Sequence, residues 1–472
     1  MDTNLILLAD AYKYSHHKLY PPETAKVYSY LESRGGMFDE TVFFGLQYIL
    51  KKYMQGIVFT KQNIEEASYY LNEMFGKSDV FDSANFKYVV DKYGGRLPVT
   101  IKAIAEGTKV PVHNVLMTIE NNDPKCFWLT NFLETTLMHV WYPTTVATLS
   151  YKIKEVIELY YNETANETSA SNIPFVLNDF GFRGASSVES AGIGGMAHLL
   201  NFRSSDTVIA SAYAKEYYNA QKITGRSVPA TEHSVMTMKG EAGELEMFRH
   251  FLKIYPTGTI SCVSDSFNIF RACAEYWGTE LKDEILHRDG MLVIRPDSGD
   301  PAMTLLNVFD ILFDKFGYVI NEKGYRVLPE QIRVIQADGV NYESILHIYQ
   351  CLKLNGISAE NIMLGMGGAL LQKVDRDTQK FALKCSYAEI NGQEVHVKKK
   401  PVEMNAKGEI EPSFKQSKAG KLQLIHTEAG FETIKYDGSK ENYDCLQTVF
   451  ENGEITKEFS FEEIQERMKN NG

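Results

Sequence analysis

The 472-residue sequence has few cysteines, and no two of them form a CxxC pair. The six cysteines lie far apart, at Cys126, Cys262, Cys273, Cys351, Cys385 and Cys445. This spacing disfavours zinc sites and disulfides, and it predicts buried thiols in a reducing cytoplasm. No apolar run reaches the roughly 18–20 residues that cross a bilayer. The short apolar run at 5–9 follows no basic region, so we expect neither a membrane span nor a signal peptide.

Basic residues are also in deficit. The chain has 49 Lys and Arg against 61 Asp and Glu, a net charge of −12. Such a chain is a poor candidate for nonspecific binding to nucleic acid or to an anionic membrane. A small anionic substrate stays compatible with this charge, because a binding site needs only a local cluster of donors. The length and the ordinary globular composition predict two or three domains, or one large fold with an addition.

The middle of the sequence repeats one theme, in which a short apolar run ends in polar residues and a helical pattern follows. The apolar runs are 175–177, 259–263, 291–294, 332–335 and 362–364. Continuous apolar runs are typical of strands buried on both faces, as in a parallel sheet. Helical spacing follows at 305–316 and 345–352, and a third helix is predicted from Phe267 to a stop at Gly278.

At least five β-then-α units therefore span about 170–385. An α/β barrel and a doubly wound sheet would both fit, and we favour the barrel because five separate strand ends contribute polar groups. Hairpin signals occur later, at Asn391-Gly392 and Asn452-Gly453. We predict a barrel over 171–385 and an additional α+β domain, with residues 1–170 completed by a β-rich region at 386–472.

Two strand ends carry the sharpest chemical signals. Arg295-Pro296-Asp297 can hold an anion through forked donors and a diol through a carboxylate, although a salt-bridged loop is an equal alternative. The glycines of 365–368 would allow backbone N–H groups to approach a phosphate. This segment lacks the Walker pattern, so on its own a tight turn is the better interpretation.

Other segments are weaker on their own. His233 could be a working imidazole if Asp265 or Asp297 orients it, although a lone histidine is more often structural. Phe180 and Arg183 could place a ring beside an anion, or they could be a core phenylalanine and a solvated arginine. The aromatic segment that begins with Asp10-Ala11-Tyr12-Lys13 could be an interface, although ordinary packing is favoured by composition.

Together these segments resemble the nicotinamide phosphoribosyltransferases, over about 5–461. The matching segments are DAYK at 10–13, YPP at 20–22, FGLQYIL at 44–50, WYP at 141–143, DFGFRG at 179–184, AGIG at 191–194, SVPATEHS at 227–234, VSDS at 263–266, IRPDSG at 294–299 and LLQK at 370–373. So many segments in the same order make a chance match very improbable.

The resemblance implies an irregular TIM-like α/β barrel of the type II phosphoribosyltransferase kind. It implies transfer of a phosphoribosyl group from phosphoribosyl pyrophosphate to nicotinamide, in the cytoplasm, to give nicotinamide mononucleotide and pyrophosphate for NAD salvage. It also implies a requirement for Mg²⁺, without assigning ligand residues here, and ATP hydrolysis that assists turnover. Finally, it implies a homodimer whose two active sites lie at the subunit interface.

The resemblance also assigns roles to individual residues around the base. Phe180 and the partner subunit's Tyr12, with Asp10 in the same motif, correspond to the residues that stack on the pyridine ring. Two aromatic faces suit a pyridine that becomes cationic in the product. Asp206 corresponds to the residue that accepts from the carboxamide, with Ser261 nearby, and a carboxylate there would disfavour nicotinic acid. A simple helix N-cap is the structural alternative for Asp206.

The remaining assignments concern the phosphoribosyl group and ATP. Arg183 and Arg295 correspond to phosphate-binding residues, Asp297 to the one that binds the ribose hydroxyls, and Asp338, Pro296 and Ala337 to neighbouring substrate-binding positions. Gly367, Gly368 and Arg376 correspond to residues at the 5′-phosphate, and Lys384 and Lys399 to basic residues that reach the site from the second subunit. His233 corresponds to the histidine that ATP phosphorylates, oriented by Asp265. The implied catalytic residues are His233, Asp265 and Asp297.

Three positions depart from the family pattern. Ala337 replaces a glycine, Met366 replaces a small polar residue and Ala369 replaces a glycine, changes that bear on affinity more than on reaction type. Three alternatives stay open: a nicotinate or quinolinate phosphoribosyltransferase, a non-catalytic protein that binds a nucleotide or sugar phosphate, and a barrel glycosidase. A glycosidase needs a pair of carboxylates, which Asp265, Asp297 and Asp338 could supply.

Overall fold

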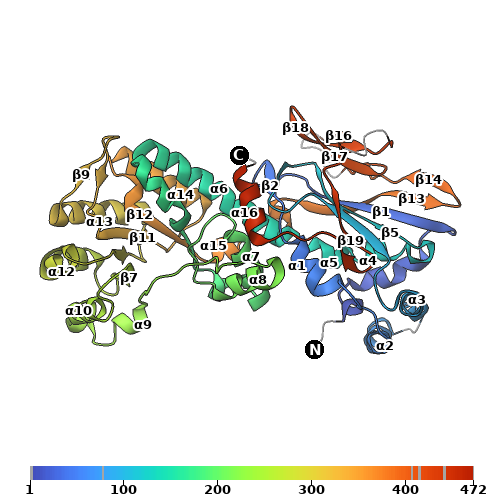
Figure 1. Ribbon diagram of the computed structural model, residues 1–472, viewed down its shortest axis with the longest axis horizontal. Coiled ribbons are helices and arrows are strands. Elements are labelled where there is room, and N and C mark those ends of the chain that lie inside the picture. Colours follow the sequence, from blue (N-terminus) through green and yellow to red (C-terminus); the bar gives the residue numbers. More distant parts are fainter. Residues whose placement is uncertain (1–3, 77–78, 405–407, 413–415, 439–442, 471–472) are drawn as a thin grey trace. The chain divides into compact units, whose positions relative to one another are not determined.

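The protein is described by a computed structural model that covers residues 4–76, 79–404, 408–412, 416–438 and 443–470 (Figure 1). The chain forms two compact units. Unit 1 consists of Met1–Thr148, Glu216–Asn219 and Asp375–Gly472, and unit 2 consists of Leu149–Lys215 and Ala220–Val374. Within the described ranges, none of the helices is long and apolar enough to span a membrane.

Unit 2 contains a sheet of five parallel strands in the order β6-β12-β11-β8-β7. The strands are β6 (Leu177–Asp179), β7 (Ile260–Val263), β8 (Leu292–Arg295), β11 (Ile332–Gln336) and β12 (Ile362–Met366). Val334 in the central strand pairs with Ile294 on one side and Ile362 on the other, and all three side chains are buried. Burial on both faces explains why these strands are continuous apolar runs.

Two irregular segments close this sheet into a barrel. Asp179 of β6 forms an isolated parallel bridge with Ser205, and Ser204 forms one with Arg226. Ala230 then bridges to Ser261 of β7, which completes the ring. The prediction of an irregular α/β barrel is therefore confirmed, and its irregularity lies in the wall formed by 203–206 and 226–231.

Helices connect the strands of unit 2. They are α6 (Trp141–Thr164, which begins in unit 1), η5 (Glu167–Phe175), η6 (Phe182–Gly184), α7 (Val188–His198), α8 (Val208–Tyr218), α9 (His233–Met236), η7 (Glu241–Gly243), α10 (Glu244–Ile254), α11 (Ile269–Arg271), η8 (Ala272–Glu280), α12 (Lys282–Leu286), α13 (Pro301–Phe316), α14 (Tyr342–Leu354), η9 (Ala359–Asn361) and α15 (Gly368–Leu371). The hairpin of β9 (Val319–Ile320) and β10 (Arg326–Val327) also belongs to this unit.

The apolar runs at 259–263, 291–294, 332–335 and 362–364 fall on β7, β8, β11 and β12, and the helices predicted at 305–316 and 345–352 lie within α13 and α14. Asn341 caps α14 through a reciprocal capping box with Ser344. Two expectations were wrong. The first strand begins at Leu177, because Phe175 ends the helix η5. Gly278 does not end its helix, because the wider turns of the π-helix η8 carry it on to Glu280.

Unit 1 is built on an antiparallel sheet of seven strands in the order β14-β13-β1-β5-β3-β19-β20. Its strands are β1 (Thr24–Ser33), β3 (Val99–Ala103), β5 (Val115–Asn121), β13 (Phe381–Ile390), β14 (Gln393–His396), β19 (Gln447–Glu451) and β20 (Glu454–Ile455). Strands from the N-terminal part of the chain form the middle of this sheet and C-terminal strands flank them on both sides, which confirms the predicted α+β addition built from both termini. Both hairpin turns are also confirmed, because Asn391 and Asn452 adopt positive φ before a glycine.

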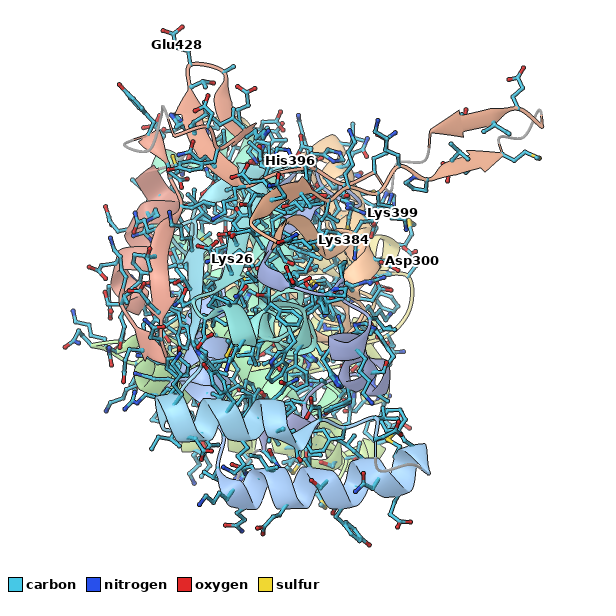
Figure 2. All side chains as sticks on the ribbon, turned by 90° about the vertical axis from the view of Figure 1, so that its right-hand side faces the viewer. Lys26, Asp300, Lys384, His396, Lys399 and Glu428 are labelled. Carbon is cyan, nitrogen blue, oxygen red and sulfur yellow. The ribbon has the colours of Figure 1, made fainter. Side chains whose placement is uncertain are left out.

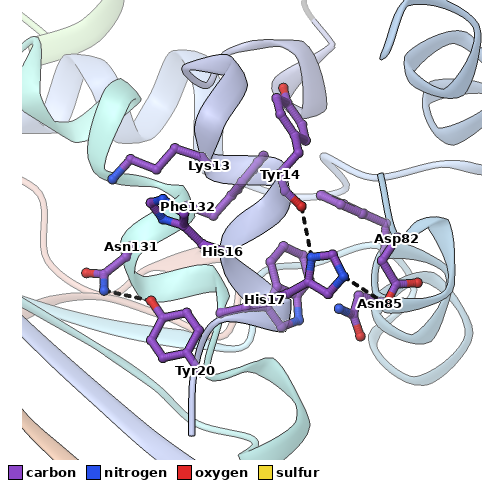
Figure 3. A pocket seen from close by; sticks show the side chains of 11 residues that line it. Lys13, Tyr14, His16, His17, Tyr20, Asp82, Asn85, Asn131 and Phe132 are labelled. Carbon is purple, nitrogen blue, oxygen red and sulfur yellow. Dashed lines mark hydrogen bonds and ion pairs between the residues drawn. The ribbon is translucent and has the colours of Figure 1, made fainter. Parts of the chain in front are cut away.

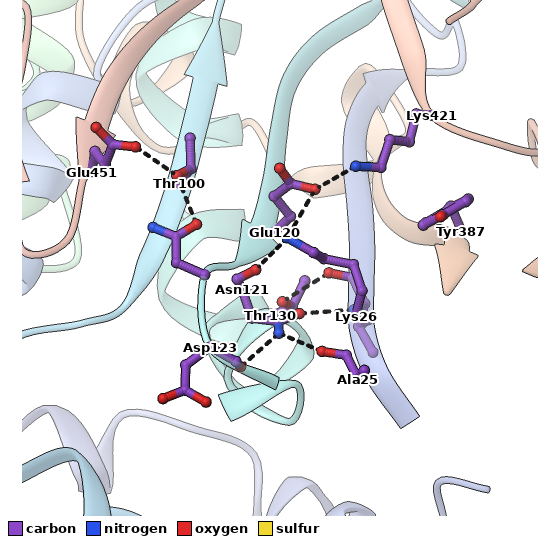
Figure 4. A network of polar contacts seen from close by, with 12 residues as sticks. Ala25, Lys26, Thr100, Glu120, Asn121, Asp123, Thr130, Tyr387, Lys421 and Glu451 are labelled. Carbon is purple, nitrogen blue, oxygen red and sulfur yellow. Dashed lines mark hydrogen bonds and ion pairs between the residues drawn. The ribbon is translucent and has the colours of Figure 1, made fainter. Parts of the chain in front are cut away.

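A buried amide joins the strands of unit 1 to the loop after β5 (Figure 4). The Asn121 side chain accepts a hydrogen bond from the Val27 N–H at 2.8 Å and donates to the carbonyls of Ala25 and Asp123. Lys26 donates to the Asn121 carbonyl, and β1 has a register irregularity between Thr24 and Lys26. The amide thus pairs with backbone groups of β1 and of the loop after β5.

The other elements of unit 1 surround this sheet. Its helices are η1 (Leu5–Leu7), η2 (Ala11–Lys18), α1 (Leu46–Ile49), η3 (Leu50–Met54), α2 (Lys61–Phe75), α3 (Ser83–Tyr93), η4 (Pro124–Cys126), α4 (Leu129–Phe132), α5 (Glu134–Met138), η10 (Arg376–Thr378) and α16 (Phe461–Asn470). Its two-stranded sheets pair β2 (Glu40–Val42) with β4 (Lys109–Pro111), β15 (Val402–Met404) with β16 (Ile410–Pro412), and β17 (Leu422–Thr427) with β18 (Gly430–Lys435).

Candidate active site

A cavity of about 1160 Å³ lies in unit 2 and is lined by the ends of the barrel strands. The structure brings many of the predicted site residues together on its walls. These are Phe180, Arg183, Asp206, His233, Ser261, Arg295, Asp297, Ala337, Asp338, Gly367 and Gly368. They converge because the carboxyl ends of parallel strands meet at the same end of a barrel. Asp265 and Pro296 lie directly behind this lining, adjacent to His233 and Asp297 respectively.

His233, Asp265 and Asp297 form one connected group. Nε2 of His233 lies 2.8 Å from Oδ1 of Asp265, and Oδ2 of Asp265 accepts the Asp297 N–H at 3.0 Å. The Asp265 side chain is 5% exposed and the His233 side chain 46% exposed. In the neutral imidazole, this contact favours the tautomer with the proton on Nε2 and the lone pair on Nδ1, on a ring that solvent can reach.

The anion-binding half of the cavity contains Arg295 and Asp297. Burial raises the pKa of the Asp297 carboxyl, as do the charges of Asp265 and Asp338, whereas Arg295 and His233 oppose this shift. Within the described part of the chain, Nε of Arg295 is buried and has no hydrogen-bond partner. This guanidinium therefore retains unused donor capacity at a strand end that faces the cavity, which suits the recognition of a phosphate.

Asp206 occupies the irregular wall of the barrel. Ser227 Oγ donates a hydrogen bond to Asp206 Oδ1 at 2.5 Å, and both residues line the cavity. The helix α8 begins two residues later, but a helix cap does not account for this contact. Ser227 was not predicted as a site residue, although it begins the 227–234 motif.

Phe180 lies against the backbone of the neighbouring strand β12. A Cβ atom on Gly365 would lie only 2.3 Å from Cε2 of Phe180, so this close approach requires a glycine. The sequence leaves Gly365 between a phosphate loop and the favoured tight turn, and the structure gives it a packing role. Gly367 and Gly368 line the cavity, and a Cβ on Gly368 would meet no atom within 4 Å.

The structure shows where two of the positions that depart from the family pattern, Met366 and Ala337, place their side chains. Met366 is 1% exposed and lies outside the cavity lining, so its side chain belongs to the core. Ala337 does line the cavity, and its methyl group lies 3.2 Å from where a Cβ on Gly365 would be. Of Met366 and Ala337, only Ala337 therefore places its side chain where it can change the shape of the cavity.

Five predicted site residues belong to unit 1 and do not line this cavity: Asp10, Tyr12, Arg376, Lys384 and Lys399. Tyr12 is 56% exposed on η2, next to Asp10, whose carboxylate accepts from Thr135 Oγ1 at 2.9 Å. Figure 3 shows how η2 is anchored, with His17 between the Tyr14 carbonyl and Asp82 and with Asn131 donating to Tyr20.

A basic cluster accompanies Tyr12 on unit 1. Burial lowers the pKa of the Lys384 ammonium, and the positive charges of Arg34, Lys13 and Lys399 act in the same direction, opposed by Glu134. Figure 2 shows Lys384 and Lys399 on nearby segments. Arg376 is exposed on η10 and pairs with Asp377. Unit 1 therefore combines an exposed aromatic ring with a concentration of cations.

Comparisons with known proteins decide the family. The model of the nicotinamide phosphoribosyltransferase N-terminal domain matches residues 4–101, and that of the nicotinate phosphoribosyltransferase (NAPRTase) family matches residues 175–454. A nicotinamide phosphoribosyltransferase of Xanthomonas campestris pv. campestris is 43% identical, over 98% of this chain and 97% of that protein. The chain belongs to the nicotinamide phosphoribosyltransferase family. A member from Acinetobacter baylyi is 32% identical, over 97% of this chain and 96% of its own length.

Solved structures support the fold of this nicotinamide phosphoribosyltransferase family member. A nicotinate-nucleotide pyrophosphorylase of Pyrococcus furiosus aligns with a TM-score of 0.59 and 14% identity, over 99% of this chain and 95% of that chain. Human nicotinic acid phosphoribosyltransferase aligns with a TM-score of 0.54 and 15% identity, over 98% and 93% of the two chains. The fold is thus that of the type II phosphoribosyltransferases, and family membership removes the glycosidase alternative.

Proposed function

We propose that this chain transfers the phosphoribosyl group of 5-phosphoribosyl 1-pyrophosphate to nicotinamide, giving nicotinamide mononucleotide and pyrophosphate. The observation that carries this proposal is the Asp206 carboxylate, held by Ser227 in the same cavity as Phe180. A fixed carboxylate can accept a hydrogen bond from a carboxamide NH₂, and it repels the carboxylate of nicotinic acid. The names of the full-length relatives support the same choice of base.

The residues of the cavity suit this reaction. The pyridine nitrogen already carries a lone pair, so it can attack the anomeric carbon without a general base. The bond from that carbon to pyrophosphate breaks, and pyrophosphate leaves with the electron pair. Arg183 and Arg295 would stabilise the phosphate charges, and Asp297 would hold the ribose hydroxyls and the positive charge that develops on the sugar.

The donor set also fits a Mg²⁺ ion that arrives with the substrate. No group of three or more metal-ligating side chains exists among the residues that the structure describes. Mg²⁺ typically uses only one or two protein carboxylates together with substrate phosphates. Asp297 and Asp338 are the carboxylates of the anion-binding half that could supply them. When bound, the ion would neutralise charge on the departing pyrophosphate.

Changing Asp206 to asparagine tests the choice of base. We expect kcat/KM for nicotinamide to fall by about tenfold and the preference over nicotinic acid to shrink by about 100-fold, because the repulsion of the acid is lost. Product formation from phosphoribosyl pyrophosphate and Mg²⁺ with each base measures both effects. Asp310→Asn, an exposed aspartate on α13, serves as the matched control. Unchanged selectivity would remove this role from Asp206.

A nicotinate-type activity is the second candidate, because the family model that covers most of unit 2 is that of nicotinate phosphoribosyltransferases. The same assay separates the two candidates in the unmodified chain. Turnover of nicotinic acid in preference to nicotinamide would overturn our assignment of Asp206 and keep the fold. Binding of phosphoribosyl pyrophosphate without product from either base would favour a non-catalytic binding protein.

ATP hydrolysis through a phosphohistidine at His233 is a further part of the proposal. The contact between Nε2 and Asp265 leaves Nδ1 as the nitrogen that can accept a phosphoryl group. We expect His233→Ala to keep the reaction without ATP and to make the rates with and without ATP equal. The exposed His287 provides a matched control through His287→Ala. Full stimulation by ATP in the His233 variant would contradict the proposed phosphohistidine.

We also propose that the protein is a cytoplasmic homodimer with shared active sites. The support is the exposed Tyr12 ring of unit 1, which has the buried Lys13, paired with Glu134, 5.5 Å from its centroid. Lys384 in turn lies within electrostatic reach of Lys13 and Lys399. An exposed ring next to cations is suited to a pyridine ring and phosphate groups bound by another subunit. The six cysteines are all free, which agrees with a reducing compartment.

A further inference from the structure

Asp179 is a fully buried aspartate at the end of β6, and although it begins the 179–184 motif, the sequence assigns it no role. Its carboxylate has two hydrogen-bond partners on two different segments. Oδ1 accepts the Gly181 N–H at 2.8 Å, and Oδ2 accepts the Ser205 hydroxyl at 3.2 Å. Burying a carboxylate costs free energy unless its oxygens accept hydrogen bonds, and these two contacts supply them.

The backbone of Asp179 is bonded to the same neighbouring segment. Its N–H donates to the Ser204 carbonyl at 3.1 Å, and its carbonyl accepts the Asp206 N–H at 3.0 Å. Asp179 therefore uses its main chain and its side chain to hold 204–206. This segment forms only isolated bridges, so it lacks the ladder of hydrogen bonds that fixes a regular strand.

The helix α7 packs closely against Asp179 and the 204–206 segment. On α7, a Cβ atom at Gly195 would lie 3.1 Å from Asp179 Oδ2 and 2.8 Å from the Ala210 Cβ, so a side chain there has no room. The fully buried His198 ring of the same helix places Nε2 3.3 Å from the Ser204 carbonyl. The segment that Asp179 holds is thus enclosed by groups that leave it little freedom.

We infer that Asp179 is the positioning residue that sets the geometry of the nicotinamide subsite, because its carboxylate ties together the two segments that present Phe180 and Asp206. Phe180 lies between Asp179 and Gly181, and Asp206 directly follows Ser205. This inference rests on the proposed function and deepens it. Asp179 itself does not line the cavity, so it acts through these two residues rather than on the substrate.

The chemistry explains why a carboxylate is needed here. Both partners are donors, and only a carboxylate presents two acceptor atoms in this geometry. An asparagine keeps one acceptor and places an NH₂ against the other donor. The Ser205 hydroxyl also accepts the Thr207 N–H at 3.0 Å, so a change in its orientation would disturb the residues on both sides of Asp206.

The test compares Asp179→Asn and Ser205→Ala with the unmodified chain. We expect Asp179→Asn to raise KM for nicotinamide by about tenfold and to weaken the preference over nicotinic acid, with KM for phosphoribosyl pyrophosphate within about twofold. Ser205→Ala removes only the hydrogen bond from Asp179 to the segment that carries Asp206. We therefore expect it to weaken the preference for nicotinamide over nicotinic acid with a smaller change in KM for nicotinamide. Parallel changes in both KM values would indicate general loosening of the barrel and overturn the inference.

A matched control separates positioning from stability. Asp123→Asn replaces another buried, hydrogen-bonded aspartate, in unit 1, and should lower the unfolding midpoint without changing either KM. If Asp179→Asn fails to fold, Ser205→Ala decides the question by its effect on selectivity. Absence of nicotinamide turnover in the unmodified chain would overturn the proposed function and this inference together. Normal turnover with unchanged nicotinamide kinetics in both variants would overturn this inference alone.

Discussion

Replacing Arg295 with alanine is expected to lower kcat/KM for phosphoribosyl pyrophosphate by about 10³-fold. The variant loses a guanidinium that faces the cavity with a buried donor left unpaired in the described structure. A charge-assisted contact to a phosphate whose charge grows as the bond breaks has an effect of about this size. Initial rates at varied phosphoribosyl pyrophosphate concentration measure it.

Two further variants sharpen this prediction. Arg295→Lys keeps the charge but loses the fork, so it should recover only part of the activity. Arg326→Ala removes an arginine that stacks over Phe313 outside the cavity, and it should leave kcat/KM unchanged. An Arg295→Ala enzyme with kcat/KM within about tenfold of the unmodified chain would exclude a direct phosphate contact.

The same variant tests whether active sites are shared between subunits. Chains carrying Tyr12→Ala and chains carrying Arg295→Ala should each be nearly inactive. If Tyr12 acts on the partner's site, a heterodimer retains one site with both residues intact. Activity should therefore return, up to about half of the normal value per dimer. Verified heterodimers without any recovery would contradict a shared site.

Replacing Gly365 with alanine is expected to raise KM for nicotinamide by about 30-fold or more. The new Cβ would overlap Phe180 Cε2 at 2.3 Å, and β12 pairs with β6 at this position. Because the paired backbone resists movement, the Phe180 ring has to move instead. Steady-state kinetics with nicotinamide and circular dichroism for folding measure the result.

A double variant identifies the cause of this effect. If the collision with the ring is responsible, Gly365→Ala combined with Phe180→Ala should match Phe180→Ala alone, a strongly non-additive result. Additive losses would show that the methyl group acts through the strand rather than through Phe180. The cycle therefore separates damage to the subsite from damage to the barrel.

Residues with strong local patterns were predictable from the sequence. Asn391 and Asn452 gave correct turns because a two-residue hairpin requires positive φ, which Asn and Gly adopt readily. Asp297 and Asp338 were found because polar residues after buried strands meet at one end of a barrel. The family resemblance contributed Asp206, whose neighbours in the sequence give no comparable signal.

Residues whose roles depend on contacts across elements were missed. Ser227 meets Asp206 across an irregular wall that has no apolar periodicity, so no strand pattern could pair the two segments. The packing role of Gly365 could not be predicted, because the ring that requires its small size belongs to Phe180, which follows β6 far away in the sequence. The prediction of a helix end at Gly278 is wrong, because the segment is a π-helix, which a pattern with a period of 3.6 residues does not indicate.

The barrel wall is built differently around the residues proposed to bind the base and around the residue proposed to bind the sugar phosphate. Arg295 ends a strand with regular partners on both sides, whereas Asp206 and Ser227 lie in segments joined by single bridges. Substitutions at 203–206 and 226–231 therefore affect isolated bridges and the side-chain contacts that hold them, while changes around β8 affect regular ladders on both of its sides. We therefore expect the segments that carry Asp206 and Ser227 to accept a change of base specificity more readily than β8 accepts a change at Arg295.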